Sequence, residues 1–150
     1  MTERVDFYIL KSTAAKQRWT FACRLTEKAY LRDLRVVIAN DTLADAQALD
    51  DLLWTFNERS FIPHKVCVDE RSLDPATAVH LTVEPTTLPC ADLLVNLSGR
   101  LPAHWERYTR IAEIIDADEE RRRLGRERFK SYRDLKVVLE THQLDETGEM

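Results

Sequence analysis

Glycine is scarce in this sequence, which contains only Gly99, Gly125 and Gly148. The first strand-like run is followed by residues 11–14, Lys-Ser-Thr-Ala, with no glycine among them. A phosphate-binding loop needs glycine at this place, because side chains would keep its backbone N–H groups away from the phosphate. The shortage therefore argues strongly against a dinucleotide-binding fingerprint or a Walker loop, and we expect no cofactor.

Patterns that would indicate a metal site or a disulfide framework are also missing. The three cysteines, Cys23, Cys67 and Cys90, are widely spaced and form no Cys-x-x-Cys pair. The four histidines show no metal-ligand spacing. We therefore predict no bound zinc and no disulfides, with three reduced cysteines that act as small, mostly buried hydrophobic residues.

Long hydrophobic runs are absent as well. No apolar stretch approaches the roughly 20 residues that a membrane-spanning helix needs. Residues 1–4, Met-Thr-Glu-Arg, do not begin a secretory signal pattern. A cytoplasmic location without membrane contact is therefore expected. With 150 residues, 44% of them hydrophobic and 32% charged, the chain has the size and composition of one globular domain.

What is present is an alternation of strand-like and helix-like segments. This order predicts an α/β fold in which residues 1–150 form a single domain. Its largely parallel central sheet would be flanked by helices on both faces, which is Rossmann-like but without a nucleotide motif. The predicted strands are Val5–Leu10, Arg35–Ala39, Val79–Val83, Asp92–Leu97 and Arg110–Ile115. The predicted helices are Ala14–Leu31, a segment capped at 40–42 that extends to Phe56, a short helix at Ala103–Tyr108 and a long final helix.

The final helix is predicted to start at residues 116–119, Asp-Ala-Asp-Glu. These resemble a capping box in which Glu119 reaches back to the first cap residue. We expect the helix to continue to about His142, with Tyr132, Leu135 and Leu139 on its sheet-facing side. The tail, about residues 143–150, is expected to fray.

Positive charge is concentrated in this helix. Residues 121–136 hold eight basic and two acidic side chains, so they carry +6 within a chain of net charge −4. The remainder is therefore strongly acidic, which makes the protein a poor general binder of duplex DNA. Arg122, Arg126, Lys130 and Arg133 follow one another at i, i+4, i+8 and i+11, so they line one helix face, and Phe129 lies beside them.

Two interpretations of this stripe remain open. It is either a solvated charged face with Phe129 in the core, or a site for an acidic peptide that ends in a hydrophobic side chain and a free carboxylate. Gly125 in the helix interior costs about 1 kcal/mol relative to alanine, which indicates a close approach by a neighbouring element.

A second candidate surface consists of three large aromatic residues, Trp54, Phe56 and Phe61, at the end of a helix and in the following loop. Aromatic side chains are favoured anchors in protein interfaces. Burial of all three in the core is the alternative.

A catalytic site finds little support. Ser98 and Arg100 follow a predicted strand, where ligands of α/β folds bind. A serine nucleophile needs a positioned base, and His104 is close only in sequence. A glycine turn that leaves the sheet is the simpler interpretation.

Three segments of the sequence resemble the chi subunit of bacterial DNA polymerase III. They are Asp6-Phe7-Tyr8, then Leu53-Trp54 with residues 60–64 (Ser-Phe-Ile-Pro-His), and finally residues 126–133 (Arg-Glu-Arg-Phe-Lys-Ser-Tyr-Arg). The resemblance runs from about Val5 to Lys136 in the same order and at similar spacing. Residues 65–91 and those after Lys136 match less clearly.

The resemblance implies a non-catalytic accessory subunit of the replicative polymerase that needs no cofactor. It implies two partners: the psi subunit, which joins the protein to the clamp loader, and the acidic C-terminal tail of single-stranded DNA-binding protein. The tail would bind at Arg126, Phe129, Lys130 and Arg133, and psi would bind at the surface that includes Trp54, Phe56 and Phe61.

Three other interpretations stay open at this point. In some members of the family the aromatic surface serves a repair helicase instead of psi. The chain could instead be an α/β enzyme acting on a small anion near Ser98 and Arg100. The basic helix could also bind nucleic acid directly, although we expect little such binding.

Overall fold

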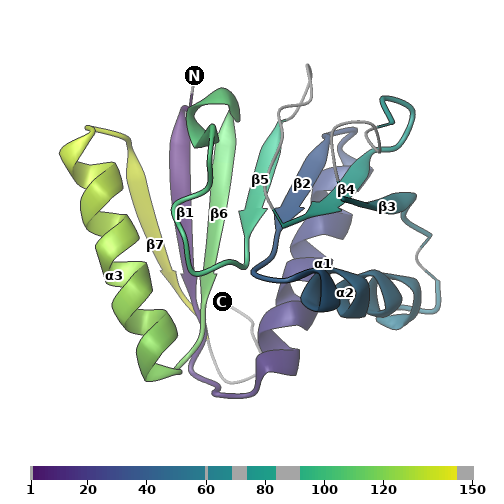
Figure 1. Cartoon of the computed structure of the whole chain (residues 1–150), viewed down its shortest axis with the longest axis horizontal. Coiled ribbons are helices and arrows are strands. Elements are labelled where there is room, and N and C mark those ends of the chain that lie inside the picture. Colours follow the sequence, from purple (N-terminus) through teal and green to yellow (C-terminus); the bar gives the residue numbers. More distant parts are fainter. Residues whose placement is uncertain (1, 60, 69–73, 84–91, 145–150) are drawn as a thin grey trace.

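A computed structural model describes residues 2–59, 61–68, 74–83 and 92–144. Within these ranges seven parallel strands form one sheet in the order β3-β4-β2-β5-β6-β1-β7 (Figure 1). The strands are β1 (Arg4–Ile9), β2 (Val36–Ala39), β3 (His64–Cys67), β4 (Val79–Thr82), β5 (Leu93–Asn96), β6 (Arg110–Ile115) and β7 (Leu139–Gln143). The helices are α1 (Ala15–Leu31), α2 (Leu43–Thr55), α3 (Glu119–Asp134) and the short 3₁₀ helix η2 (Trp105–Arg107).

The central strands are apolar on both faces, because both faces of the sheet are covered. All four residues of β2 are buried, as expected for a parallel strand between two layers of helix. On one face α1 and α2 close a core that includes Leu49, Ile38 and Leu81. On the other face α3 packs through Tyr132 on Phe7 and its neighbours. The predicted α/β class with helices on both faces is confirmed.

The end of the final helix was predicted wrongly. α3 ends at Asp134, and Lys136 turns the chain with a φ of 62°. The chain then enters β7, where Leu139 pairs with Val5 of β1. Tyr132, Leu135 and Leu139 have a helical spacing by coincidence, so the pattern concealed the turn between them. Leu135 is 59% exposed and does not face the sheet.

The start of α3 also differs from the predicted capping box. Asp118 is the N-cap, and its carboxylate accepts a hydrogen bond of 2.9 Å from the Arg121 backbone N–H. Asp116 lies before the helix, and its carboxylate instead accepts two hydrogen bonds from the Arg121 guanidinium. The acidic cap that the sequence predicts is therefore present, but two residues later.

The two edge strands are the parts of the sheet that the sequence predicts least well. Residues 57–69, which contain β3, have the sequence of a loop with a short extended piece, and β7 lies in the expected helix. The tail was also predicted too early: Gln143 closes β7, and the N–H of Leu144, only 1% exposed, donates to the Ile9 carbonyl. Residues 145–150 of that tail are outside the described ranges.

Two smaller predictions can also be compared with the structure. Cys23 and Cys67 are free and buried, as expected, whereas Cys90 lies outside the described residues. Among the described helices, none combines the length and the hydropathy that a membrane-spanning segment requires.

Candidate protein-binding surfaces

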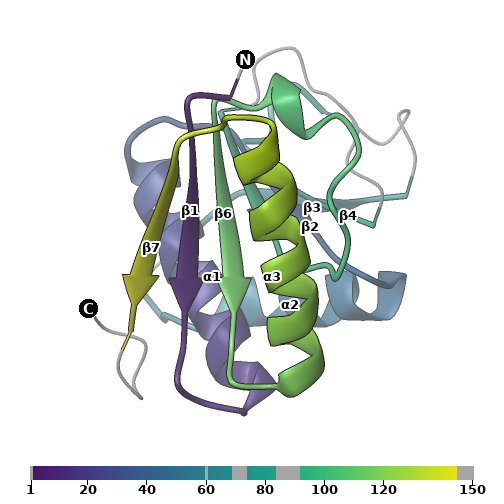
Figure 2. The same ribbon diagram turned by 90° about the vertical axis from the view of Figure 1, so that its left-hand side faces the viewer.

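Helix α3 lies against the sheet through one narrow face. A Cβ atom added at Gly125 would lie 2.3 Å from Ile115 Cδ1, so the glycine allows the close contact between α3 and β6 that its position in the sequence indicates. One and two turns further on, Arg128 and Tyr132 are buried on the same side. Figure 2 shows α3 beside β6, with β1 and β7 further toward the sheet edge.

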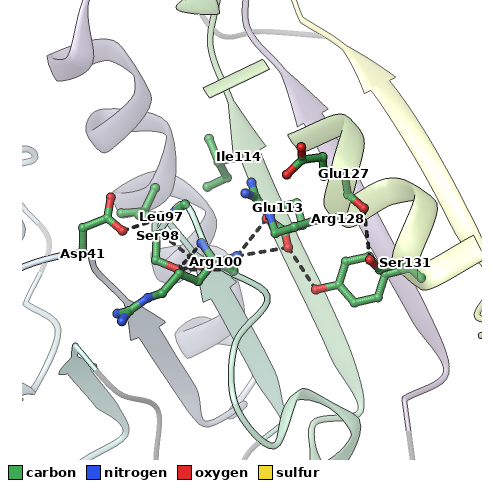
Figure 3. Close-up of polar contacts among 12 residues, drawn as sticks. Asp41, Leu97, Ser98, Arg100, Glu113, Ile114, Glu127, Arg128 and Ser131 are labelled. Atoms are coloured by element: carbon green, nitrogen blue, oxygen red, sulfur yellow. Dashed lines mark hydrogen bonds and ion pairs between the residues drawn. The ribbon is translucent and has the colours of Figure 1, made fainter. Parts of the chain in front are cut away.

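A buried network fixes the rotation of α3. Glu113 of β6 has no exposed surface, and its carboxylate accepts hydrogen bonds from Arg128 Nε (3.0 Å), Tyr132 Oη (2.9 Å) and Asn96 Nδ2 (3.0 Å) (Figure 3). Burial, and then the neighbouring Glu113 carboxylate, raise the pKa of Tyr132, so this hydroxyl remains a donor. Because these contacts hold two successive turns, they determine which side chains of α3 face solvent.

The outer flank of α3 that faces away from β7 is internally neutralised. Arg123 forms ion pairs with Glu120, three residues before it, and with Glu127, four residues after it. The hydrogen bonds lower the pKa of Glu120 and raise that of Arg123. Both carboxylates are already engaged, so this flank has little unbalanced charge.

The flank toward β7, which we call the basic flank, consists of the exposed side chains of Arg122, Arg126, Lys130 and Arg133. Among the described residues, neither Arg126 nor Lys130 has a carboxylate within ion-pair distance. Arg133 lies 3.8 Å from Asp134, and both side chains are 61% exposed, so water screens this pair. The basic flank therefore presents cations that are free to pair with a partner.

Phe129 sits at the inner border of the basic flank. Its ring packs edge-on against Phe7, with 5.2 Å between ring centroids, and it remains partly exposed. Phe129 thus belongs to the margin of the core, between the two alternatives that the sequence left open. The structure also places Leu135 and Val138, each 59% exposed, at the turn after α3. The sequence analysis missed them because it extended the helix through this turn.

The three predicted aromatic residues divide into two locations. Trp54 (46% exposed) and Phe61 (69% exposed) lie with 5.5 Å between ring centroids and form what we call the aromatic patch. Phe56 is partly buried against the core instead and lines a cavity of about 900 Å³ between α1 and the sheet. Phe56 therefore differs from the other two aromatic residues in burial, whereas its predicted role in partner binding stays a prediction.

His64 supports the aromatic patch from behind, a role that the sequence did not indicate. Its ring lies 4.3 Å from that of Trp54, between centroids. Its Nδ1 is 2.6 Å from the Ile62 carbonyl, and its Nε2 is 3.1 Å from the Asp50 carbonyl. These contacts attach the loop before β3 to α2, so the two exposed rings are held in a fixed relation.

The hollow at the carboxyl ends of the strands, about 530 Å³, is the place where a small-anion enzyme would bind its substrate. Its polar groups hold the fold together instead. Arg18 donates to the carbonyls of Leu97 (2.7 Å) and Ile114 (2.9 Å), and burial lowers its pKa to about 10. The Ser98 hydroxyl donates 2.6 Å to Asn96 Oδ1, which is no base. Arg100 donates to the Val83 carbonyl. The geometry gives the enzyme interpretation no support.

A cluster of Asp6, Glu140 and His142 has the residue types of a metal site, with ligand atoms within 4.8 Å of one another. However, Asp6 also accepts hydrogen bonds from Arg110 (2.9 Å) and Arg4 (3.3 Å), and two guanidinium groups beside a carboxylate oppose a dication. Burial raises the pKa of Asp6, but the hydrogen bonds from His142 and Arg110 outweigh it and lower the pKa. The cluster is an ion-pair network that fastens β7 to β1 and β6.

Taken together, the fold and its surfaces define a class: an α/β domain that offers two exposed surfaces suited to protein partners. The family model for "DNA polymerase III chi subunit, HolC" matches residues 1–140. The chain belongs to this family, as the resemblance in the sequence predicted. The family is a replication accessory subunit rather than a catalytic one.

Curated relatives cover nearly the whole chain. DNA polymerase III subunit chi of Pseudomonas aeruginosa is 33% identical over 141 residues, which is 94% of this chain and 96% of the relative. The subunit chi of Haemophilus influenzae is 26% identical over 133 residues, 89% of this chain and 92% of the relative.

The fold also resembles that of a solved structure, the Mss116p DEAD-box helicase domain 2 bound to an RNA duplex. The TM-score is 0.56 at 11% identity, and the match covers 93% of this chain and 64% of the helicase chain. This likeness shows a shared α/β architecture and nothing about RNA or helicase function.

Proposed function

We propose that this protein is a non-catalytic tether of the replicative DNA polymerase in the cytoplasm. The basic flank, with Phe129, binds the acidic C-terminal tail of single-stranded DNA-binding protein. The aromatic patch binds the psi subunit, which joins the protein to the clamp loader. The family membership supports the replication setting, and the two surfaces support two separate partners.

The observation that carries the tail-binding proposal is the imbalance of charge on α3. Arg126 and Lys130 lack carboxylate partners within the described ranges, whereas Arg123 on the same helix has two. Phe129 lies next to Lys130 in the helix, and Leu135 and Val138 are exposed at the turn where α3 ends. A peptide that combines carboxylates with a hydrophobic end matches both features.

The expected affinity follows from the exposure of these groups. Each exposed ion pair contributes about 0.2–1 kcal/mol, and burial of a terminal phenylalanine adds about 1.5–3 kcal/mol. Association also costs translational and side-chain entropy, so we expect a Kd of about 1 μM that rises with salt. Several tails displayed on one strand of DNA would strengthen such weak contacts through avidity.

The position of the two surfaces supports simultaneous binding. The aromatic patch lies next to β3, and the basic flank lies on the side of β7, so the surfaces occupy opposite edges of the sheet (Figure 1). A partner at one edge does not cover the other. A protein that tethers two partners needs two surfaces that can be occupied at the same time.

The decisive experiment measures fluorescence anisotropy of a labelled acidic peptide that ends in Pro-Phe. Wild type should bind it with a Kd of about 1 μM. Lys130→Ala should weaken binding about 3- to 5-fold, since one exposed ion pair contributes up to about 1 kcal/mol. Arg123→Ala is the matched control: it removes one positive charge from the neutralised flank of the same helix and should change the Kd less than 2-fold.

Two outcomes would oppose the proposal. Absence of peptide binding at low salt would remove the tail site from α3. Tight binding of bare single-stranded DNA with a steep salt dependence would favour direct nucleic-acid recognition by the basic flank instead. If a repair helicase displaces psi in a competition experiment, then the aromatic patch serves both partners.

A further inference from the structure

β7 is one of the two edge strands of the sheet, and within the described residues it pairs with β1 alone. It is the last strand of the sheet, and no described strand lies beyond it (Figure 2). Glu140, Thr141 and Gln143 are exposed, as expected for an uncovered edge. An open edge presents unpaired N–H and C=O groups that can accept an added strand.

The pairing with β1 identifies which groups of β7 point outward. The Val5 N–H donates to the Val138 carbonyl, and the Leu144 N–H donates to the Ile9 carbonyl, so residues 138 and 144 face β1. In a parallel ladder alternate residues face the same neighbour. The backbone groups of Leu139, Thr141 and Gln143 therefore point away from the sheet.

The side chains of these same three residues lie on the face that α3 covers. Leu139 pairs with Val5 and Thr141 with Phe7, and both β1 residues belong to the core beneath α3. The side chains of β7 next to its open edge and the basic flank of α3 thus lie on the same face of the sheet. Phe129, which packs on Phe7, lies between them.

Protection of this edge is weak. Natural edge strands are often blocked by lysine, proline or a bulge. The sequence of β7, Leu-Glu-Thr-His-Gln, contains neither lysine nor proline. The opposite edge strand β3 carries the exposed Lys65. β7 is therefore the more receptive edge.

The lengths of the two elements are similar. From Arg122 to Arg133 the helix rises about 16 Å, at about 1.5 Å per residue. From its first residue to its last, β7 spans about 13 Å, at about 3.3 Å per residue. One extended segment of five residues could therefore hydrogen-bond along all of β7 while its carboxylates meet successive cations of the basic flank.

We infer that the acidic peptide bound by the basic flank adds to the sheet as an eighth strand on the open edge of β7. This inference rests on the proposed function, because it takes the same partner and specifies how its backbone is held. Main-chain hydrogen bonds to Leu139, Thr141 and Gln143 supply part of the affinity, and the cations select acidic side chains.

The arrangement also sets the direction of the added strand. α3 runs opposite to the strands, so Arg133 lies near the start of β7 and Arg122 near its end (Figure 2). Leu135 and Val138, both 59% exposed, are at the start as well. A peptide whose hydrophobic residue is at its carboxyl end therefore places that end at the start of β7 and runs antiparallel to it.

The test uses backbone-methylated peptides with the full-length protein. Two variants of the acidic peptide carry N-methyl groups on alternate residues, one in each of the two registers. Strand addition predicts that one register loses at least 10-fold in affinity while the other stays within about 2-fold, because alternate N–H groups face β7. Equal affinities in the two registers, whether high or low, would overturn strand addition.

Hydrogen exchange gives an independent readout on the protein. Saturation with unmodified peptide should slow exchange at the amides of Leu139, Thr141 and Gln143 at least 10-fold, with Lys65 on the opposite edge as the unchanged control. Unchanged rates with a bound peptide would overturn the added strand and leave the tail site intact. If the unmodified peptide fails to bind at all, then the proposed function fails together with the inference.

Discussion

The basic flank and the aromatic patch differ in what holds their exposed side chains in place. The basic flank lies on one helix, and a buried network of polar side chains sets which residues it exposes. The aromatic patch joins a helix to a loop through His64 and exposes two rings directly. A charged surface depends on a rigid support and on low salt, whereas an aromatic surface depends on contact area. The two surfaces should therefore respond differently to mutation and to salt.

The largest effect should come from the support beneath the basic flank. Glu113→Ala leaves the buried Arg128 without its carboxylate, and removal of one member of a buried ion pair costs about 3–5 kcal/mol. We expect the free energy of unfolding, measured by urea denaturation, to fall by about that amount. Tail binding should weaken in the folded protein while binding at the aromatic patch persists.

Glu113→Gln provides the control that keeps the shape of the side chain. It should be destabilised less than Glu113→Ala, since the amide oxygen can still accept one hydrogen bond. Equal loss of binding at both surfaces in the folded variants would contradict the independence of the two surfaces.

A second prediction concerns the aromatic patch. Phe61→Ala should lower affinity for the psi subunit by about 2 kcal/mol, or about 30-fold, as is usual for an aromatic anchor. Because Phe61 is 69% exposed, the free energy of unfolding should change by less than about 0.5 kcal/mol. Calorimetric titration at two salt concentrations would test the comparison: psi binding should be less sensitive to salt than tail binding. A stronger salt effect on psi binding would reverse the assignment.

The smallest effect should appear at low pH. The pKa of Asp6 is lowered in the folded protein, so its contribution to stability is present above the unfolded value of about 3.9 and is lost as the pH falls through the folded value. Asp6→Asn should therefore flatten the loss of stability below about pH 4, measured by denaturation at each pH. If the free energy of unfolding falls equally at low pH in wild type and in Asp6→Asn, then the ion-pair network does not hold β7 in place.

Sequence reasoning predicted the buried parts of the fold well and its edges poorly. β1, β2, β5 and β6 are apolar runs whose burial determines their state. β3 and β7 are short and largely polar, and only pairing with a neighbouring strand makes them strands. No local pattern contains that information. The turn at Lys136 needs a positive φ, which lysine rarely adopts, so the residue type does not predict the turn.

The candidate sites show the same division. Helical spacing correctly placed Arg126, Phe129, Lys130 and Arg133 on one flank of α3. The same spacing places Glu120 and Glu127 within reach of Arg123, a neutralisation that the sequence analysis did not consider. Helical spacing could not separate Phe56 from the aromatic patch, because all three aromatic residues lie near the same helix end.

Because the two surfaces lie at opposite edges, the width of the sheet sets the distance between them. Seven strands in one sheet contain six spacings of about 4.8 Å, or about 29 Å from β3 to β7. Every step of that length is a hydrogen-bonded pair of strands within one core, so the distance is fixed by the fold. In the proposed tether, the flexibility that a moving replication fork requires would therefore come from the partners' own extended segments.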